Sequence, residues 1–269
     1  MSTPVLSAIH VFPLKSGAAL APAHAEVEAR GLHADRRWMV VDADGRFLTA
    51  RKHPRMTLIE ARIEAEGCLQ LDAPGMPTLA LVPAGAATAR IDVTVWKSTL
   101  SARRANAEAD EWISHFLGLP ARFVHMDRES ERSVDPAYAS PGDLVSFADG
   151  FPLLLVSQAA LDALNAKLAR PVPMLRFRPN LVVAGTAAHA EDGWRRIRIG
   201  AVEFDVVKPC ARCVLTTVDP THGTFDADGE PLRTLLGYRR TPQGVMFGQN
   251  LVARGTGSVQ VGDAVHVLE

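Results

Sequence analysis

The chain of 269 residues has little cysteine and no excess of charge of either sign. Its 3 cysteines are too few for a disulfide framework, and an odd number is typical of a reducing compartment. They also leave no set of four thiolates for an iron–sulfur cluster. The 29 Lys and Arg residues nearly balance 30 Asp and Glu residues, which argues against nucleic-acid binding as a main function.

Long hydrophobic runs are missing as well. The longest apolar stretches, such as Leu153–Val156, fall far short of the ~20 residues that a membrane helix needs. The N-terminus lacks the basic segment and the following apolar segment of a secretory signal. We therefore expect a soluble, cytoplasmic protein that does not associate with membranes.

Several catalytic signatures are also absent. No glycine-rich loop has Walker or Rossmann spacing, and no G-x-S-x-G element supports serine hydrolase chemistry. The 9 histidines show no H-x-x-x-H or similar pairing, so we interpret them as surface or hydrogen-bonded residues rather than metal ligands.

The composition that remains is globular, with 47% apolar and 22% charged residues. Most of the chain is typical of short strands separated by turns. Asp42–Gly45 predicts a hairpin turn between strands at 37–41 and 46–50, and further hairpins are expected over 58–71 and 89–103.

Two segments have helical spacing of apolar residues. The first begins after Asn106 as N-cap and ends at Gly118. The second begins after Ser157 and is expected to continue to Pro171, and a short helical turn is expected over 232–236.

A polar stretch, Asp127–Asp143, is typical of a linker because it contains two prolines and a glycine. We therefore predict a β-rich domain over 1–125 and a second domain over 126–269. Short strands with frequent turns favour a mainly β fold with a few helices, built as barrels or sandwiches, over a parallel α/β sheet.

Cys210 and Cys213 follow a strand-like run. Such a pair can bind zinc, form a redox couple, pack in a core or supply one thiolate to the metal of a cofactor. Zinc would need two more ligands at similar spacing. A redox pair usually opens a helix, whereas 214–218 is β-branched and strand-like. Lys208 and Arg212 supply positive charge that favours a thiolate, and the alternatives stay open on this evidence.

Polar residues at the ends of predicted elements suit an anionic ligand. Ser157 can hold a phosphate at a helix N-terminus or act as an ordinary cap. Lys15 and Ser16 form a donor pair at a strand end.

Two further positions carry guanidinium groups beside other polar side chains. Arg178 and Asn180 precede a buried strand, where arginine can bind phosphate in a bidentate way or face solvent. Arg36 follows Asp35, so one of the neighbouring arginines is expected to pair with the carboxylate while the other faces the anion.

The run Lys208–Pro220 resembles the C-x-R-C-x-x-T-T-V-D-P motif of MOSC-domain molybdenum cofactor proteins. Further blocks agree in order over nearly the whole chain and resemble the branch of the mitochondrial amidoxime-reducing component and bacterial YcbX-like proteins. These blocks are Phe12–Ser16, Asp35–Val40, Phe177–Asn180, Ala190–Trp194 and Phe247–Gln249.

This resemblance implies a MOSC β-barrel domain after a smaller β-rich N-terminal MOSC domain, with the first strands, about 1–36, completing the cofactor site. It implies a molybdenum cofactor, Mo-molybdopterin, and we do not expect pyridoxal phosphate. Cys213 matches the catalytic cysteine that ligates molybdenum. Asn250 stands where mitochondrial members have tyrosine. The cofactor-binding residues implied are Lys15, Ser16, Arg36, Ser157, Arg178, Asn180, Ala211, Arg212 and Asn250.

The activity implied is two-electron reduction of N-hydroxylated small molecules such as amidoximes, hydroxylamines and N-hydroxylated bases. Electrons are expected from a separate flavin or iron–sulfur donor protein. The alternative is a non-catalytic cofactor carrier or sulfur-handling MOSC module. Some bacterial relatives continue into a 2Fe-2S ferredoxin domain, which we expect this chain to lack because Cys68 is its only other cysteine.

Overall fold

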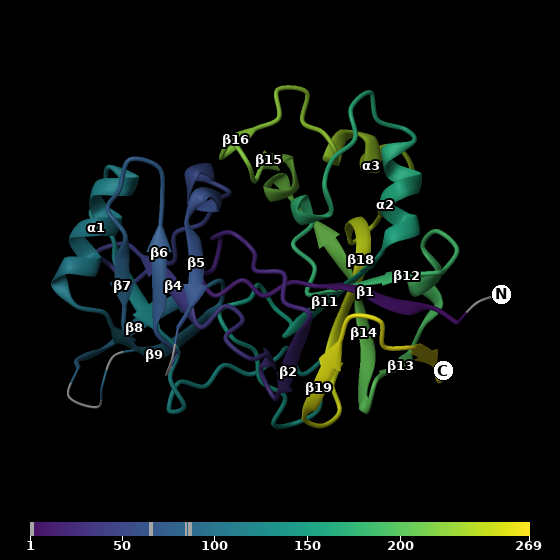
Figure 1. Cartoon of the computed structure of the whole chain (residues 1–269), viewed down its shortest axis with the longest axis horizontal. Coiled ribbons are helices and arrows are strands. Elements are labelled where there is room, and N and C mark those ends of the chain that lie inside the picture. Colours follow the sequence, from purple (N-terminus) through teal and green to yellow (C-terminus); the bar gives the residue numbers. More distant parts are fainter. Residues whose placement is uncertain (1–2, 65–66, 84, 86–87) are drawn as a thin grey trace.

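The computed structural model describes residues 3–64, 67–83, 85 and 88–269. Its largest sheet forms a barrel, on the right of Figure 1. The strand order is β1-β12-β11-β18-β14-β13-β20, and β17 pairs with β18. In chain order these strands are β1 (Val5–Ile9), β11 (Leu153–Ser157), β12 (Leu181–Ala184), β13 (Arg196–Ile199), β14 (Val202–Arg212), β17 (Arg240–Thr241), β18 (Gly244–Ala253) and β20 (Val265–Val267).

The barrel closes because its two edges meet near the chain ends. Val5 of β1 forms a bridge with Ala264, and the N–H of Val265 donates to the carbonyl of Pro4 at 2.8 Å. The first strand of the chain thus completes a barrel whose other strands come from residue 153 onward. Buried apolar side chains form its core, among them Leu6, Leu155, Val183, Phe204 and Val265.

The N-terminal half, on the left of Figure 1, contains two smaller sheets and a helix. One sheet has the order β4-β10-β9-β8 and the other β5-β6-β7. A core that includes Trp38, Trp112, Phe116 and Phe123 holds these elements together. Their bounds are β4 (Trp38–Val41), β5 (Glu60–Ile63), β6 (Leu69–Asp72), β7 (Leu79–Leu81), β8 (Arg90–Val95), β9 (Ser98–Arg104), α1 (Ala107–Leu117) and β10 (Arg122–His125).

Short elements complete the fold. β19 pairs with β2, which pairs with β3, so a second N-terminal segment is tied to the C-terminal half. The helices α2 and α3 share a core with Phe177 and Phe247. The bounds are β2 (His24–Glu28), β3 (Gly31–Leu32), α2 (Gln158–Asn165), β15 (Val218–Asp219), β16 (Thr224–Phe225), α3 (Leu232–Tyr238) and β19 (Gly257–Gln260), with 3₁₀ turns at Pro54–Leu58, Met174–Arg176, Ala190–Gly193 and Val214–Thr217.

The mainly β fold and its barrel are confirmed. The first helix is confirmed with its caps, because the Asn106 side chain accepts the N–H of Ala109 and Gly118 has the left-handed φ of 70°. The hairpins over 58–71 and 89–103 appear as β5–β6 and β8–β9. Residues 65–66, in the first of these turns, lie outside the described residues. None of the described helices is long and apolar enough to span a membrane.

Three expectations need correction. The segment 46–50 forms no regular strand and meets β4 through a bridge between Phe47 and Val41. The second helix ends at Asn165, well before Pro171. After Cys213 the chain forms a 3₁₀ turn rather than a strand, because N–H and hydroxyl groups of Thr216 both donate to the carbonyl of Cys213.

The domain boundary expected at residue 125 stays a prediction. β1, β2 and β3 precede that boundary, yet β1 pairs with β12 and β2 with β19. The N-terminal segment therefore runs through the C-terminal half before it enters the N-terminal sheets.

Gly248 on β18 has no room for a side chain. Its φ is +79°, and a Cβ there would lie 2.7 Å from the carbonyl oxygen of Leu155 on β11. We expect Gly248→Ala to lower the free energy of unfolding by at least about 1–3 kcal/mol, from the backbone conformation alone. Urea unfolding measures this.

Gly193→Ala is the matched control, because Gly193 has an ordinary φ and open space around the Cβ position. It should change stability by no more than about 0.5 kcal/mol. Equal stability of the two variants would contradict the close approach of β18 to β11.

Candidate functional site

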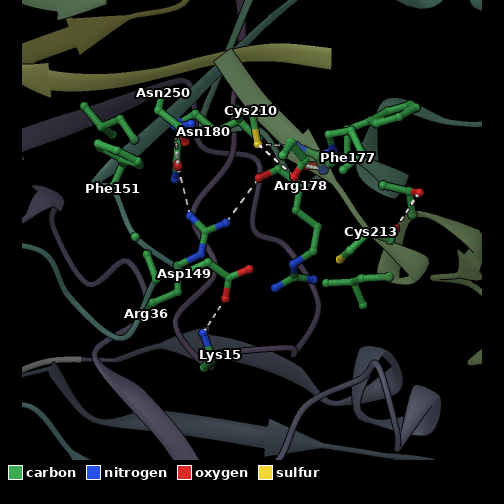
Figure 2. A pocket seen from close by; sticks show the side chains of 18 of the residues that line it. Lys15, Arg36, Asp149, Phe151, Phe177, Arg178, Asn180, Cys210, Cys213 and Asn250 are labelled. Atoms are coloured by element: carbon green, nitrogen blue, oxygen red, sulfur yellow. Dashed lines mark hydrogen bonds and ion pairs between the residues drawn. The ribbon is translucent and has the colours of Figure 1, made fainter. Parts of the chain in front are cut away.

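One pocket is lined by residues from both halves of the chain. Its empty volume is about 890 Å³, a figure that includes the open solvent at its mouth. Figure 2 shows side chains from distant parts of the sequence converging on this hollow. Among the residues that line it are Lys15, Ser16, Arg36, Arg51, Asp149, Phe177, Arg178, Asn180, Cys210, Ala211, Arg212, Cys213 and Asn250.

The end of β14 carries the cysteine loop into this pocket. The register of β14 against β18 shifts at Lys208 and again after Pro209, which has no N–H to donate to a ladder. These irregularities lead the strand to Cys213, which opens the 3₁₀ turn. Both thiols are free and partly buried.

Each thiol of the loop accepts a hydrogen bond from a different arginine. Cys210 Sγ accepts from Arg212 Nη1 at 2.9 Å, and Cys213 Sγ accepts from Arg51 Nε at 3.2 Å. The two cysteines are therefore held separately, and both sulfurs lie in an electropositive part of the pocket.

Arg36 is fixed by a buried network at the pocket wall. Its Nη1 donates to Asp35 Oδ2 at 2.6 Å and to Asn180 Oδ1 at 2.9 Å. Asp35 also accepts the N–H of Phe12 at 2.8 Å. Asn180 is held in turn by its Nδ2, which donates to the carbonyl of His10 at 3.1 Å. The expected pairing of one arginine with Asp35 is thus present. The other arginine, Arg37, was expected to face the anion, but it pairs with Glu28 and does not line the pocket.

Arg36 and Arg178 both lie over the ring of Phe12. Their guanidinium carbons are 4.2 and 4.1 Å from the ring centroid, a cation–π arrangement. Both residues, and Ser16, have positive φ (49°, 54° and 71°). Left-handed backbone in non-glycine residues is costly and concentrates at functional sites.

Lys15 and Asp149 form an ion pair in the same pocket. Lys15 Nζ donates to Asp149 Oδ1 at 2.8 Å (Figure 2). It also donates to the carbonyl of Phe147 at 2.6 Å. Burial lowers the pKa of Lys15 to about 8, although Asp149 opposes this shift and Arg51 adds to it. Burial alone would raise the pKa of Asp149, but Lys15 and Arg51 hold that pKa well below its usual range.

The pocket contains more positive charge than its acids can balance. Burial, with the nearby charge of Arg36, lowers the pKa of Arg178. Arg178 Nη2 and Arg212 Nε are buried and have no hydrogen-bond partner within the described residues. Buried donors rarely lack partners, so these groups fit an anion that the protein binds.

The structure brings together every site residue expected from the sequence except Ser157. Ser157 is fully buried and does not line the pocket. Its hydroxyl accepts the N–H of Ala160 at the start of α2, and its own N–H donates to Glu191. Its hydroxyl thus acts as an ordinary helix cap, and a contact of Ser157 with the cofactor stays a prediction. Asn250 and Ala211 line the pocket, and Asn250 Nδ2 donates to the carbonyl of Lys208.

Sequence reasoning missed Arg51 and Asp149. Arg51 lies between β4 and β5, and Asp149 lies between β10 and β11. Neither has a motif around it that signals a role. Only the fold shows that Arg51 bridges the Asp149 carboxylate, at 2.5 Å, and the Cys213 sulfur.

The fold and the pocket together define a class of protein. A mainly β chain with a closed barrel holds two free thiols beside a cluster of buried guanidinium groups. Such a site suits an anionic ligand whose metal accepts a soft sulfur donor.

Comparison with known proteins gives the family. The MOSC N-terminal beta barrel domain matches residues 3–120, and the MOSC domain matches residues 143–266. The mouse mitochondrial amidoxime-reducing component 1 is 35% identical over 96% of this chain and 80% of its own length. The human protein of that name is 33% identical over 96% of this chain and 81% of its own. The chain belongs to the MOSC-domain family, in the amidoxime-reducing component branch, as its motifs predicted.

Among solved structures, the YUAD protein from Bacillus subtilis aligns over 100% of this chain and 98% of its own. The two sequences are 11% identical, and the TM-score is 0.46.

The depressed pKa of Lys15 predicts a pH dependence of stability in the cofactor-free chain. Below pH 8 the amine is protonated in both the folded and the unfolded state. Between pH 8 and 10.5 the folded state has released the proton that the unfolded chain retains. The free energy of unfolding should therefore rise over this window by up to about 3 kcal/mol.

Urea unfolding from pH 7 to 10.5 measures this rise, with Lys15→Met as the comparison. The difference between the two curves isolates Lys15 from other groups that titrate in the same range. Parallel curves for the two proteins would show that Lys15 does not titrate as its burial requires.

Proposed function

We propose that the protein is a molybdenum cofactor-dependent oxidoreductase that reduces N-hydroxylated small molecules. The observation that carries this proposal is the position of Cys213, a free thiol in a pocket with unbalanced buried cations. The names of the curated relatives, which describe amidoxime-reducing components, support the substrate class.

The residues of the pocket fit the parts of Mo-molybdopterin. The cofactor carries a phosphate, for which Arg178 and Arg212 have donors that no described residue satisfies. Its metal accepts thiolate sulfur, which Cys213 would supply. Lys15, Ser16, Arg36 and Asn250 also line the pocket and are candidates for further contacts.

When bound, the molybdenum centre supplies the two-electron chemistry that removes oxygen from an N-hydroxylated substrate. The role of the protein is to bind the cofactor and to orient it. Asp35 and Phe12 keep Arg36 in place, and Asp149 keeps Lys15 and Arg51 in place. These fixed cations favour an anionic cofactor without rearrangement, which is the benefit of preorganised electrostatics. Cys213 remains a permanent ligand and does not act as a nucleophile.

We propose that electrons come from a separate flavin or iron–sulfur protein. The cytoplasmic location expected from the sequence stays a prediction, while the curated relatives carry the word mitochondrial in their names.

Cys213→Ser should lower the turnover rate for benzamidoxime at least about 100-fold, because a hard hydroxyl replaces a soft thiolate ligand. The assay uses protein from a host that makes the cofactor and a chemical reductant as electron source. Wild-type protein given NADH alone should show no turnover, because the donor protein is absent.

Cys210→Ser is the matched comparison, since it removes the other thiol of the same loop. It should keep most of the activity if only Cys213 ligates the metal. If cofactor-containing wild-type protein reduces no N-hydroxylated substrate with any reductant, the proposed enzyme activity is refuted. That result would favour the non-catalytic cofactor carrier.

A further inference from the structure

Arg51 joins the two halves of the molecule at the mouth of the pocket. It follows β4 in the N-terminal half, yet its Nε donates to Cys213 Sγ at 3.2 Å and its Nη2 to Asp149 Oδ2 at 2.5 Å. One guanidinium thus bridges the sulfur at the end of β14 and the Asp149 carboxylate, which lies between β10 and β11.

Trp96 holds Arg51 from a further side. The Arg51 guanidinium lies over the Trp96 ring, 4.6 Å from its centroid, and Trp96 Nε1 lies 3.4 Å from Asp149 Oδ1. Phe47 contacts the same ring edge-on at 4.9 Å. Trp96 has a left-handed backbone (φ 55°) at the turn between β8 and β9 and is 46% exposed. Such strain in an exposed aromatic residue is maintained where surrounding contacts require it.

The hydrogen bond from Arg51 is what holds the Cys213 sulfur. Among the described residues, Arg51 is the only side chain that donates a hydrogen bond to it, whereas Cys210 accepts one from Arg212 of its own loop. The contact to Cys213 therefore comes from a segment 162 residues away in sequence. A planar guanidinium can use two edges at once, for the sulfur and for the carboxylate, which an ammonium group cannot do in the same geometry.

We propose that Arg51 is a positioning residue that acts through Cys213. Held by Trp96 and Asp149, it fixes the direction of the Cys213 sulfur and draws electron density from it. Hydrogen bonds to a ligating sulfur tune the redox properties of the metal it binds. This inference rests on the proposed function, because it treats Cys213 as the metal ligand.

The test compares Arg51→Met and Arg51→Lys with wild-type holoenzyme. In Arg51→Met, kcat for benzamidoxime should fall by about 10–100-fold at unchanged molybdenum content per chain. KM should stay within about twofold, since Arg51 acts on the metal ligand. The midpoint potential of molybdenum, followed by electron paramagnetic resonance, should become more negative. Arg51→Lys keeps the positive charge but cannot bridge Cys213 and Asp149. Its kcat and midpoint potential should lie between those of wild type and Arg51→Met.

Arg55→Met is the matched control. Arg55 lies four positions further on, is exposed, and stacks on Phe116 inside the N-terminal half without lining the pocket. It should leave kcat and the midpoint potential unchanged. Wild-type kcat and potential in Arg51→Met, or a loss of kcat that only follows lost molybdenum, would overturn the proposal.

A second arm uses the cofactor-free chain and needs no turnover. Alkylation rates of Cys213 by iodoacetate and by iodoacetamide are measured at one pH, and their ratio reports local positive charge independently of thiol access. Trypsin cleaves after Arg212, so Cys210 and Cys213 are followed in separate peptides. The ratio of the iodoacetate rate to the iodoacetamide rate at Cys213 should fall about fivefold in Arg51→Met and keep its wild-type value in Arg51→Lys. The same ratio at Cys210 should not change in either variant.

The two arms separate the possible failures. Wild-type protein without molybdenum would refute the proposed function, while the alkylation ratio would still show whether Arg51 lies on the sulfur. An unchanged ratio in Arg51→Met would refute the Arg51 contact even if the wild-type enzyme contains molybdenum and is active.

Discussion

Buried positive charge that exceeds the acids around it is the constraint that shapes the pocket. Arg36 is balanced by Asp35, and Lys15 and Arg51 share Asp149. Arg178 forms no ion pair with any residue that the structure describes, and burial lowers its pKa. A buried cation is costly unless it is paired. The arrangement therefore suits a bound anion.

The topology explains how so many cations reach one place. β1 closes the barrel, so the chain leaves the barrel edge and delivers Lys15 and Ser16 to the pocket before it reaches the N-terminal sheets. The segments before β12 and at the end of β14 then bring Arg178 and Cys213 from the other side. Neither half has the whole site, and the bridge from Arg51 to Cys213 links them directly.

Local signals in the sequence were reliable where one residue decides the backbone. Asn106 and Gly118 define the ends of α1, because a cap and a left-handed glycine need only their neighbours. The family motifs grouped Lys15, Arg36 and Arg178 correctly, although nothing in their spacing shows that Phe12 lies between two of them.

Other features depend on contacts that no local pattern encodes. Ser157 has the residue type and position of a phosphate ligand, but the barrel buries it away from the pocket. The 3₁₀ turn after Cys213 overrides the strand propensity of β-branched residues, because threonine side chains bond the backbone. Arg51 and Asp149 become site residues only through the packing of two distant segments.

The most direct test of the central claim is the molybdenum and pterin content of purified wild-type protein from a host that makes the cofactor. The account predicts about one molybdenum and one pterin per chain. Arg178, Arg212 and the thiol of Cys213 lie in one pocket, and no residue in the described part of the chain satisfies one donor of each arginine. Pure, folded protein that contains neither would contradict it.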